Sequence, residues 1–201
     1  MKRVAIFIDG FNLYHALDDN PHLRQYRWLD VVGLAKSILH LDETLVDTCF
    51  FTTIVSWDSE KEKQQRAYIK ALEWSGAKMI FGEFHKKIIK CKKCGAQFSK
   101  YEEKQTDVNI AVELLRQAQA DTFDSAIVLS GDSDLIAALR LVRDIYPQKK
   151  IAIAIPPGRR AEQLKSVAHF HLKIRADQVQ NSQFPTIINL PNGHKIISPY
   201  Q

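Results

Sequence analysis

Carboxylates stand directly after two apolar segments of the chain, where they could share a metal ion. Asp9 follows Val4–Ile8, and Asp132 and Asp134 follow Ser125–Leu129. Apolar segments without alternation are typical of strands buried on both faces of a parallel sheet, and ligands bind at the carboxyl ends of such strands. Carboxylates this close together need a compensating cation. Because the ligands are all oxygens, the pattern predicts Mg²⁺ or Mn²⁺ rather than zinc.

Asp107 and Asn12 extend this acidic set. Asp107 begins a predicted helix before the second of these strands, and Asn12 lies three residues after Asp9, on the turn into the next helix. The Asn12 amide could orient a carboxylate, a water molecule or a phosphate oxygen. Such a site suits metal-assisted hydrolysis of a phosphodiester, which needs no nucleophilic Ser or Cys. The predicted catalytic residues are Asp9, Asn12, Asp107, Asp132 and Asp134, and the four acids are the predicted ligands of Mg²⁺ or Mn²⁺.

Helix capping is the alternative interpretation of each acid, because Asp and Ser are favoured at helix N-termini. Asp9-Gly10 could form only a turn, and Asp107 follows Thr106 in a predicted first helical turn. Two observations favour a metal site over capping. Three acidic strand ends or helix starts share one predicted edge of the sheet, and a cap needs one acid whereas the segment Ser130–Asp134 contains two.

Strand and helix patterns alternate along most of the chain, which has 201 residues and suits one domain with a small insert. This alternation favours an α/β fold with a doubly wound, mostly parallel sheet of Rossmann type. Strands are predicted at Val4–Ile8, Thr44–Ile54, Lys78–Phe81, Ser125–Leu129 and Lys150–Ile155, and helices at Leu29–Leu39, Ser59–Trp74, Thr106–Ala118 and Ser133–Ile145.

Two segments do not fit the alternation. The lysine-rich segment Phe84–Tyr101, with Cys91-Lys92-Lys93-Cys94 in its middle, is predicted to be a hairpin insert. After residue 175 the chain becomes rich in Asn, Gln and Pro. Ile187–Leu190 and Lys195–Ser198 flank an Asn-Gly pair, which predicts a β-hairpin. We therefore expect a domain over residues 1–175, with the insert at 84–101, and a tail over residues 176–201.

Three motifs, in this order, make the chain resemble the NYN domain family from about residue 3 to about residue 175. They are Ile6-Phe7-Ile8-Asp9-Gly10-Phe11-Asn12-Leu13-Tyr14, Glu103-Lys104-Gln105-Thr106-Asp107-Val108 and Ser130-Gly131-Asp132-Ser133-Asp134-Leu135. The family is grouped with PIN-like ribonucleases of Rossmann-type fold, so the resemblance implies a PIN-like fold and a metal-dependent ribonuclease. By motif match, the metal-binding acids of the family fall on Asp9, Asp107, Asp132 and Asp134, with Asn12 beside them, and the sequence departs from the pattern at none of these positions.

Cys91 and Cys94 form half of a zinc-binding pattern. A tetrahedral structural site needs two more ligands. His85 is a candidate third ligand, and two Cys pairs from a symmetric homodimer could supply all four. The alternative is a reduced turn that binds no zinc. Cys49 lies on a predicted core strand, where we expect a buried free thiol.

Basic residues are the candidates for contacts with a phosphate backbone. The chain has 28 Lys and Arg against 23 Asp and Glu, a net charge of +5 that weakly favours a polyanionic partner. Lys104 lies close to Asp107 in sequence, and Arg159 and Arg160 follow a predicted strand end, so these three are predicted to bind nucleic acid. The insert lysines could either follow a phosphate backbone or form a solvated surface. They are Lys86, Lys87, Lys90, Lys92 and Lys93.

The other aromatic and imidazole side chains carry weaker signals. His15, His169 and His171 show no metal-ligand pattern, and we interpret them as structural residues. The three tryptophans are interpreted as core or stacking residues, a choice that the sequence leaves open. They are Trp28, Trp57 and Trp74.

A metal-dependent nuclease that acts on RNA is the function that these residues favour. The alternative is a non-catalytic nucleic-acid-binding or scaffold protein with the same fold. Phosphate-ester hydrolysis of the haloacid-dehalogenase type is disfavoured, because position 11 is Phe where that pattern needs a second Asp. No apolar run approaches the roughly 20 residues that span a bilayer, so no membrane partner is expected. Three cysteines are too few for a disulfide scaffold, which predicts a reducing, cytoplasmic location.

Overall fold

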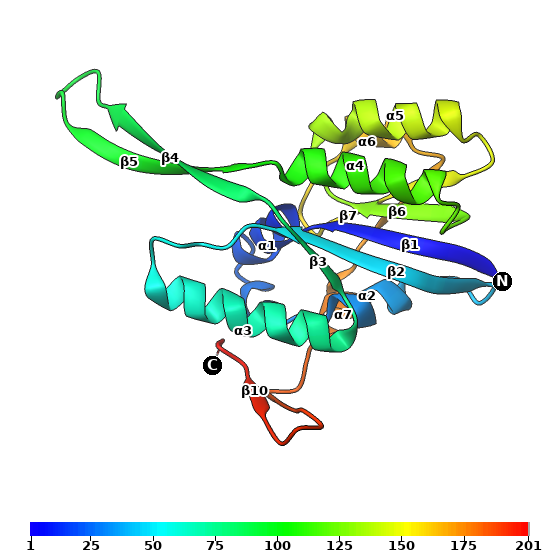
Figure 1. The fold of residues 1–201 in the computed structure, drawn as a ribbon, viewed down its shortest axis with the longest axis horizontal. Helices are drawn as coiled ribbons and strands as arrows, with labels where there is room; N and C mark the ends of the chain where they lie inside the picture. Colours follow the sequence, from blue (N-terminus) through cyan, green and yellow to red (C-terminus); the bar gives the residue numbers. More distant parts are fainter. Residues whose placement is uncertain (201) are drawn as a thin grey trace.

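Six parallel strands form the central sheet in the computed structural model, which describes residues 1–200. Their order in the sheet is β3-β2-β1-β6-β7-β8, and each strand is parallel to its neighbours. The doubly wound parallel sheet predicted from the sequence is therefore confirmed (Figure 1). The strands are β1 (Lys2–Asp9), β2 (Glu43–Thr52), β3 (Lys78–Phe81), β6 (Ser125–Leu129), β7 (Lys150–Ile155) and β8 (Phe170–Lys173).

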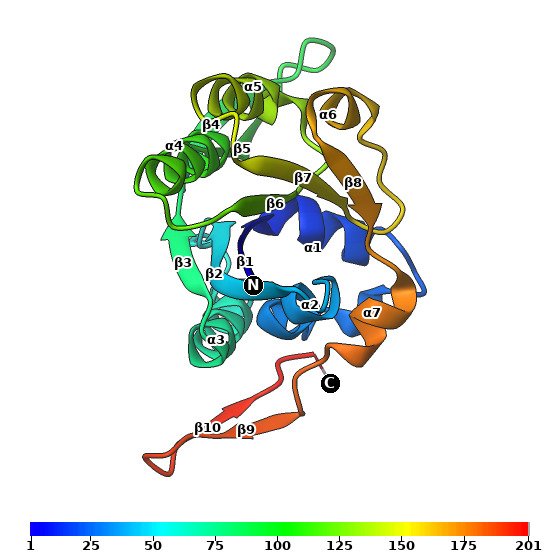
Figure 2. The same cartoon turned by 90° about the vertical axis from the view of Figure 1, so that its right-hand side faces the viewer.

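Helices cover both faces of the sheet (Figures 1 and 2). One face carries α1 (Gly10–Asp18), α2 (Val31–Ser37), α3 (Ser59–Ser75) and α7 (Ala176–Asn181), and the other carries α4 (Thr106–Gln119), α5 (Ile136–Ile145) and α6 (Glu162–Val167). The side chains of β1 alternate between two buried cores, because successive residues of a strand point to opposite faces. Ile6 and Ile8 belong to the core under α1 and α2, whereas Phe7 belongs to the core under α4 and α5.

The direction in which strands are added reverses between β1 and β6. From β1 the chain continues to β2 and β3 on one side, then returns to place β6, β7 and β8 on the other. Ile8 pairs with Leu129, so the residues that follow these two strands emerge side by side. Such a switch point leaves a crevice outside the carboxyl ends of the strands. Asp9 and the segment after Leu129 therefore share that crevice.

Gly10 allows the chain to turn closely from β1 into α1. A Cβ atom at this position would lie 2.5 Å from the Phe51 carbonyl oxygen and 2.8 Å from the Phe50 ring. Because the neighbouring β2 backbone comes so close, only a residue without a side chain fits here. This close approach brings α1 against the end of β2.

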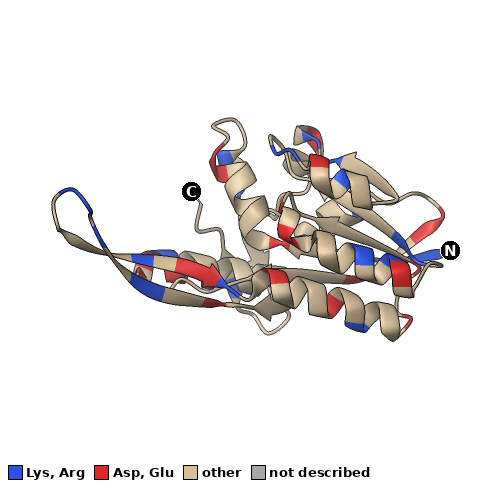
Figure 3. Cartoon of the chain, turned by 90° about the horizontal axis from the view of Figure 1, so that it is seen from above, with Lys and Arg blue, Asp and Glu red and all other residues tan. Residues whose placement is uncertain are grey.

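Two β-hairpins leave the main body. β4 (Glu83–Lys90) and β5 (Gln97–Lys104) form a long antiparallel hairpin that projects from the sheet, with lysines at its distal turn (Figures 1 and 3). β9 (Ile187–Asn189) and β10 (Lys195–Ile197) form the second, which packs Ile188 and Ile196 on the core under α1 and α2. Both hairpins are predicted from the sequence, and the first extends slightly beyond residues 84–101. The boundary at residue 175 between a domain and a tail stays a prediction.

Several elements differ from the sequence prediction. The edge strand β8 and the helices α6 and α7 are additional, and the helix expected after the turn at Asn12 begins instead at Gly10 as α1. β8 has only four residues, three of them exposed, so no apolar run marks it. The segment predicted as one helix over Ser133–Ile145 begins instead with a 3₁₀ turn, Ser133–Leu135, before α5. A second 3₁₀ turn spans Arg24–Tyr26.

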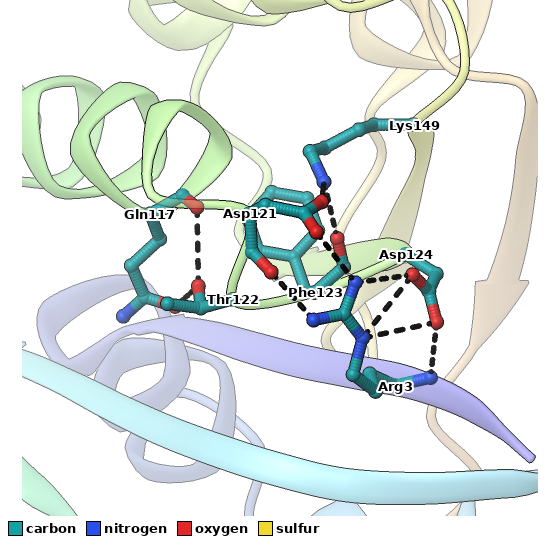
Figure 4. A network of polar contacts seen from close by, with 7 residues as sticks. All are labelled: Arg3, Gln117, Asp121, Thr122, Phe123, Asp124 and Lys149. Carbon is teal, nitrogen blue, oxygen red and sulfur yellow. Dashed lines mark hydrogen bonds and ion pairs between the residues drawn. The ribbon is translucent and has the colours of Figure 1, made fainter.

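A charged network fixes the opposite end of the sheet, far from the carboxyl ends of β1 and β6 (Figure 4). The Arg3 backbone N–H donates to Asp124 Oδ2 at 2.8 Å, and the Arg3 guanidinium donates to Asp124 Oδ1 at 2.7 Å. Lys149, only 2% exposed, donates to Asp121 Oδ1 at 2.5 Å and to the Phe123 carbonyl oxygen at 2.6 Å. These contacts join the starts of β1, β6 and β7, so the strands are held in register below the crevice.

Candidate functional site

Asp9 is the central carboxylate at the switch point. It is the last residue of β1 and also caps α1, because its Oδ1 accepts a 2.9 Å hydrogen bond from the Asn12 backbone N–H. Its Oδ2 accepts a 2.9 Å hydrogen bond from Ser130 Oγ. Asp9 is 5% exposed. Burial raises the pKa of Asp9, and these two hydrogen bonds, which lower it, offset that effect only in part.

The segment after β6 is fixed to the start of α1 by further hydrogen bonds. Asn12 Oδ1 accepts a 3.0 Å hydrogen bond from the Gly131 backbone N–H, and Ser130 Oγ accepts one of 3.0 Å from the Asp132 N–H. The Asp134 N–H donates in turn to Asp132 Oδ1 at 2.9 Å. Capping is therefore part of the role of Asp132, as it is of Asp9. These bonds hold the carboxyl groups of two chain segments that are far apart in sequence at one edge.

Asp107 and Glu103 form the opposite wall of this site. Asp107 lies in the first turn of α4, and Glu103 lies near the end of β5. Thr106 donates to Glu103 Oε1 through its backbone N–H at 3.1 Å and also through its hydroxyl. The pKa of Asp107 is raised to about 6, first by burial and then by the negative charges of nearby acids. Those acids are Asp132, Asp9, Glu103 and Asp134.

A cavity of about 370 Å³ lies between these walls. The structure brings five of the predicted site residues to its lining: Asp9, Asn12, Asp107, Asp132 and Arg159. Asp134 is exposed just outside the lining, and its charge raises the pKa of Asp107. The lining also contains Phe11, His15, Glu103 and Thr106, none of which the sequence predicts as site residues.

Of the three predicted phosphate-binding residues, only one lines this cavity. Arg159 lines it, donates to Asp19 Oδ2 at 2.7 Å, and has a buried Nε without a hydrogen-bond partner among residues 1–200. Lys104 and Arg160 do not line it. Lys104 Nζ lies 3.5 Å from Glu102 Oε2, and Arg160 is exposed, with its backbone beside Gly131. Arg159 is thus the one predicted cation in the wall of the acidic cavity.

Comparison with known protein families identifies the chain. The sequence profile of the NYN domain matches residues 3–175. This chain belongs to the NYN domain family. The family falls within the PIN-like nucleases, and the parallel α/β sheet described above agrees with that fold. In this NYN domain the acidic cavity lies at the switch point of the sheet, where ligands of open α/β sheets bind.

Two individual proteins are similar to this NYN domain. One is 6-hydroxy-3-succinoylpyridine 3-monooxygenase HspA of Pseudomonas putida, 23% identical over 240 residues, with 98% of this chain and 74% of that protein covered. The other is a protein of unknown function from Vibrio parahaemolyticus, whose crystal structure has a TM-score of 0.59 and 20% identity. That match covers 88% of this chain and 94% of the other. At this identity the structural likeness shows the fold alone.

The donor set of the acidic cavity fits a hard divalent cation. Its acids offer only carboxylate oxygens, which are the ligands that Mg²⁺ and Mn²⁺ prefer. The like charges that raise the pKa of Asp107 are also the charges that a cation would compensate. The acids are more widely spaced than a closed metal cage, because no three of their ligand atoms lie within 4.8 Å of one another. Mg²⁺ usually keeps several water ligands, so this spacing suits it.

A tighter group of ligand atoms lies elsewhere in the NYN domain. Among residues 1–200, only Asp47, Cys49 and Glu113 bring three such atoms within 4.8 Å of one another. Lys78 Nζ lies 2.8 Å from Glu113 Oε1, and Arg116 Nη2 lies 2.6 Å from the same oxygen. These two cations help to lower the pKa of Glu113 to about 2. A divalent ion would have to displace them, so this group fits a metal poorly.

Cys49 is buried and free, as the sequence predicts. Gln117 Nε2 lies 3.3 Å from its sulfur and 2.7 Å from Asp47 Oδ2. Burial and the neighbouring carboxylates raise the pKa of the Cys49 thiol. The thiol is therefore a poor thiolate ligand, which further weakens the case for a metal at this group.

Cys91 and Cys94 lie at the distal turn of the β4–β5 hairpin, and both are free. Backbone hydrogen bonds within the turn lower the pKa of Cys91. His85 cannot be the third ligand predicted from the sequence, because it lies six residues earlier on the extended strand β4, roughly 20 Å away at strand rise. Within one chain, the Cys pair therefore remains half of a zinc site.

Among the residues that the sequence interpretation missed, His15 has a recoverable signal. It lies three residues after Asn12 on α1, which is the spacing that places two side chains on one helix face. His15, interpreted from the sequence as a structural residue, lines the cavity and is exposed. Glu103 also has a local signal, because it lies four residues before Asp107 in the same motif. Among residues 1–200, none of the helices is long and apolar enough to cross a membrane.

Proposed function

We propose that this NYN domain is a metal-dependent nuclease that hydrolyses phosphodiester bonds in RNA. The observation that carries the proposal is the meeting of Asp9, Asp107 and Asp132 around one cavity at the switch point of the sheet. The proposed ligands of Mg²⁺ or Mn²⁺ are these three acids and Asp134. Membership of a PIN-like nuclease family supports the same reaction class.

Each residue of the cavity has a distinct part in this proposal. The two hydrogen bonds on Asp9 fix the orientation of its carboxylate, and Asn12 holds the loop that carries Asp132. Arg159 presents a guanidinium on the cavity wall, where it can hold a phosphate oxygen. A divalent ion would lower the pKa of an attacking water and stabilise charge on the phosphodiester oxygens. Lys104 and Arg160, at the margin, are proposed to bind the flanking backbone.

A nucleic-acid substrate is proposed because a basic hairpin stands next to the acidic cavity, and RNA is the class that the resemblance to PIN-like ribonucleases implies. The hairpin ends at Lys104, three residues before Asp107, so a strand that follows it would be led to the acids. Lys87 lies 2.5 Å from Glu102 and is paired, whereas no ion pair joins Lys86, Lys90, Lys92 or Lys93 to an acid among residues 1–200.

A reducing cytoplasm is the proposed location, on the ground of the three free cysteines.

The direct test compares Asp132→Asn with Asp144→Asn. Asp144 is exposed on α5 and has no hydrogen bond or ion pair among the described residues, so it is a matched control. We expect the parent and Asp144→Asn to cleave labelled single-stranded or hairpin RNA when Mn²⁺ is added, and Asp132→Asn to be at least about 100-fold slower. Cleavage by Asp132→Asn at the parental rate, or cleavage that chelation does not stop, would contradict the proposal. RNA binding without metal-stimulated cleavage would favour the non-catalytic alternative.

Chemistry on a substituted pyridine is a second candidate function. HspA is named for a reaction of 6-hydroxy-3-succinoylpyridine and aligns with 98% of this chain. A cavity of about 440 Å³, lined by aromatic side chains, also lies next to the acids. Incubation of the chain with 6-hydroxy-3-succinoylpyridine, oxygen and reduced nicotinamide cofactor tests this candidate. An oxidised product would favour it, and the nuclease proposal predicts that none forms.

A further inference from the structure

An aromatic cavity of about 440 Å³ lies beside the acidic cavity. It is bounded by α1, the end of β2, the start of α3 and the base of the β4–β5 hairpin. Seven Phe, Tyr and Trp rings line it: Phe11, Tyr14, Phe50, Trp57, Tyr68, Phe84 and Tyr200. The cavity is within the size range of sites that hold small ligands or parts of larger ones.

Helix α1 forms a wall common to both cavities. Phe11 and His15 line the aromatic cavity and also the acidic cavity. They flank Asn12 and are four residues apart, so they share one face of the helix. A planar group in the aromatic cavity would therefore lie directly beside a phosphate held at the acids.

Successive ring contacts lead from the acids to the hairpin. Phe84 packs edge-on against Phe11, with ring centroids 5.6 Å apart, and against Trp57 at 4.6 Å. Trp57 stacks on Tyr101 of β5, with centroids 3.7 Å apart and planes within 7°. Trp57 is nevertheless 40% exposed. Because Trp57 lines the cavity and is partly exposed, part of its ring surface is accessible to a ligand there.

The lining of the aromatic cavity contains two cations, Arg27 and Lys61, and no acidic residue. Both cations are paired with acids outside the lining, Arg27 with Asp18 at 3.0 Å and Lys61 with Asp58 at 3.6 Å. Arg27 lies over the Tyr200 ring, 4.8 Å from its centroid, and its buried Nε has no hydrogen-bond partner among residues 1–200. A flat heteroaromatic ligand matches the rings of this cavity, and the lining contains no carboxylate that would oppose its attachment to a phosphate.

We propose that the aromatic cavity holds the base of the nucleotide next to the phosphodiester that is cleaved. This inference rests on the proposed nuclease function and adds a base-binding subsite to it. Bases of single-stranded RNA stack on aromatic side chains, and every base has a face that can do so. Stacking here would place one base beyond the α1 wall and its phosphate on the acidic side. The subsite requires an unpaired base, so single-stranded RNA is the expected substrate form.

The experiment measures binding and does not need cleavage. The probes are the four ribonucleoside 5′-monophosphates, with ribose 5-phosphate as the probe that lacks a base. They are titrated into the parent, Trp57→Ala, Trp57→Phe and Trp74→Ala, with tryptophan fluorescence and calorimetry as readouts. Trp74 is 49% exposed near the end of α3 and does not line the cavity, so it is the matched control. Thermal unfolding of each variant checks that the fold is kept.

We expect at least one nucleotide to bind roughly ten-fold or more tightly than ribose 5-phosphate. Trp57→Ala should remove this preference, Trp57→Phe should retain most of it, and Trp74→Ala should leave it unchanged. Equal binding of nucleotide and ribose 5-phosphate by the parent would overturn the subsite. A preference for nucleotide over ribose 5-phosphate that survives in Trp57→Ala would also overturn it. Binding of 6-hydroxy-3-succinoylpyridine in the cavity, with exclusion of nucleotides, would overturn it as well.

The outcomes separate this inference from the nuclease proposal. Base-dependent binding through Trp57 without RNA cleavage would contradict the nuclease and leave a nucleotide-binding cavity. Metal-dependent RNA cleavage that is equally fast in Trp57→Ala and in the parent, at RNA concentrations far below saturation, would contradict the subsite and leave the nuclease.

Discussion

Ser130 Oγ donates a 2.9 Å hydrogen bond to Asp9 Oδ2 across the point where the strand order of the sheet reverses. The same oxygen accepts a hydrogen bond from the Asp132 backbone N–H at 3.0 Å. Ser130 is fully buried. The Ser130 hydroxyl thus links Asp132 to Asp9, alongside the hydrogen bond from the Gly131 N–H to Asn12 Oδ1 that holds the same loop.

Ser130→Ala should weaken both the fold and the binding of a divalent ion. Loss of one buried hydrogen bond costs about 1 kcal/mol of unfolding free energy. The hydrogen bond also favours the charged form of Asp9, so its removal raises the Asp9 pKa further. We expect a lower Mn²⁺ affinity, with the larger loss at pH 6 than at pH 8. Urea unfolding and calorimetry measure the two effects. Ser133→Ala, at an exposed serine three residues later, should change neither.

Asp107→Asn should stabilise the metal-free protein at neutral pH. The folded pKa of about 6 lies above the ordinary value of 3.8, so the folded state binds the extra proton between these values. The carboxylate of Asp107 therefore lowers the free energy of unfolding. This loss of stability is absent below about pH 4 and complete above about pH 6. Because Asp107 is half-exposed, we expect a gain of only about 1 kcal/mol at pH 7.5.

Urea unfolding of Asp107→Asn in EDTA, from pH 4 to pH 8, measures this dependence. The gain over the parent should shrink to nothing on acidification, and Asp144→Asn should show no such trend. A gain that is absent at pH 7.5, or one that increases as the pH falls, contradicts the assigned repulsion among the acids.

The hairpin lysines should control the salt dependence of RNA binding. Lys86, Lys90, Lys92 and Lys93 are changed together to Gln, in an Asp132→Asn background that does not cleave. We expect weaker binding and a flatter plot of log affinity against log salt. The slope should fall by about 0.7 for each phosphate of single-stranded RNA that a lysine no longer neutralises.

The control changes lysines at a different basic site, a cleft of about 460 Å³ between α3 and β10. Lys63 and Lys70 line that cleft. Changing them to Gln should leave the slope unchanged. If this pair flattens the slope and the hairpin set does not, RNA follows α3 and not the hairpin.

Zinc, if it binds, should join two chains through their hairpin turns. Each chain offers Cys91 and Cys94, and His85 is too far along β4 to complete the site. Light scattering with zinc titration should show a dimer with one zinc for two chains, because a tetrahedral site needs four ligands. Cys94→Ser should remain monomeric, and Cys49→Ala should still dimerise. One zinc bound by each monomer, or zinc binding by Cys94→Ser, would exclude this arrangement.

The buried parts of the sheet could be predicted from sequence with accurate boundaries. β6 and β7 match the predicted Ser125–Leu129 and Lys150–Ile155 at both ends, because every residue of these strands except Lys150 is buried. Asp9 and Asp132 follow buried parallel strands, and such strands end at the same edge of a sheet. This rule alone therefore predicts from the sequence that the two acids lie close together.

The remaining parts depend on contacts that no local pattern encodes. The edge strand β8 is largely exposed, so it lacks an apolar run. Glu103 is close to Asp107 in sequence, but its approach to Asp9 depends on the return of the β4–β5 hairpin to the sheet. The same return places Tyr101 on Trp57. Trp74, interpreted as a core or stacking residue, is instead 49% exposed and has no aromatic partner among residues 1–200.

Calorimetric titration of Mn²⁺ is the most direct measurement of whether the acids at the switch point bind a divalent ion. It compares the parent with Asp9→Asn, Asp144→Asn and Asp47→Asn, each checked for an intact fold by thermal unfolding. We predict saturable binding by the parent, unchanged in Asp144→Asn and Asp47→Asn and at least about ten-fold weaker in Asp9→Asn. Binding by Asp9→Asn with parental affinity, or a loss of affinity in Asp47→Asn alone, would contradict a metal site at the carboxyl ends of β1 and β6.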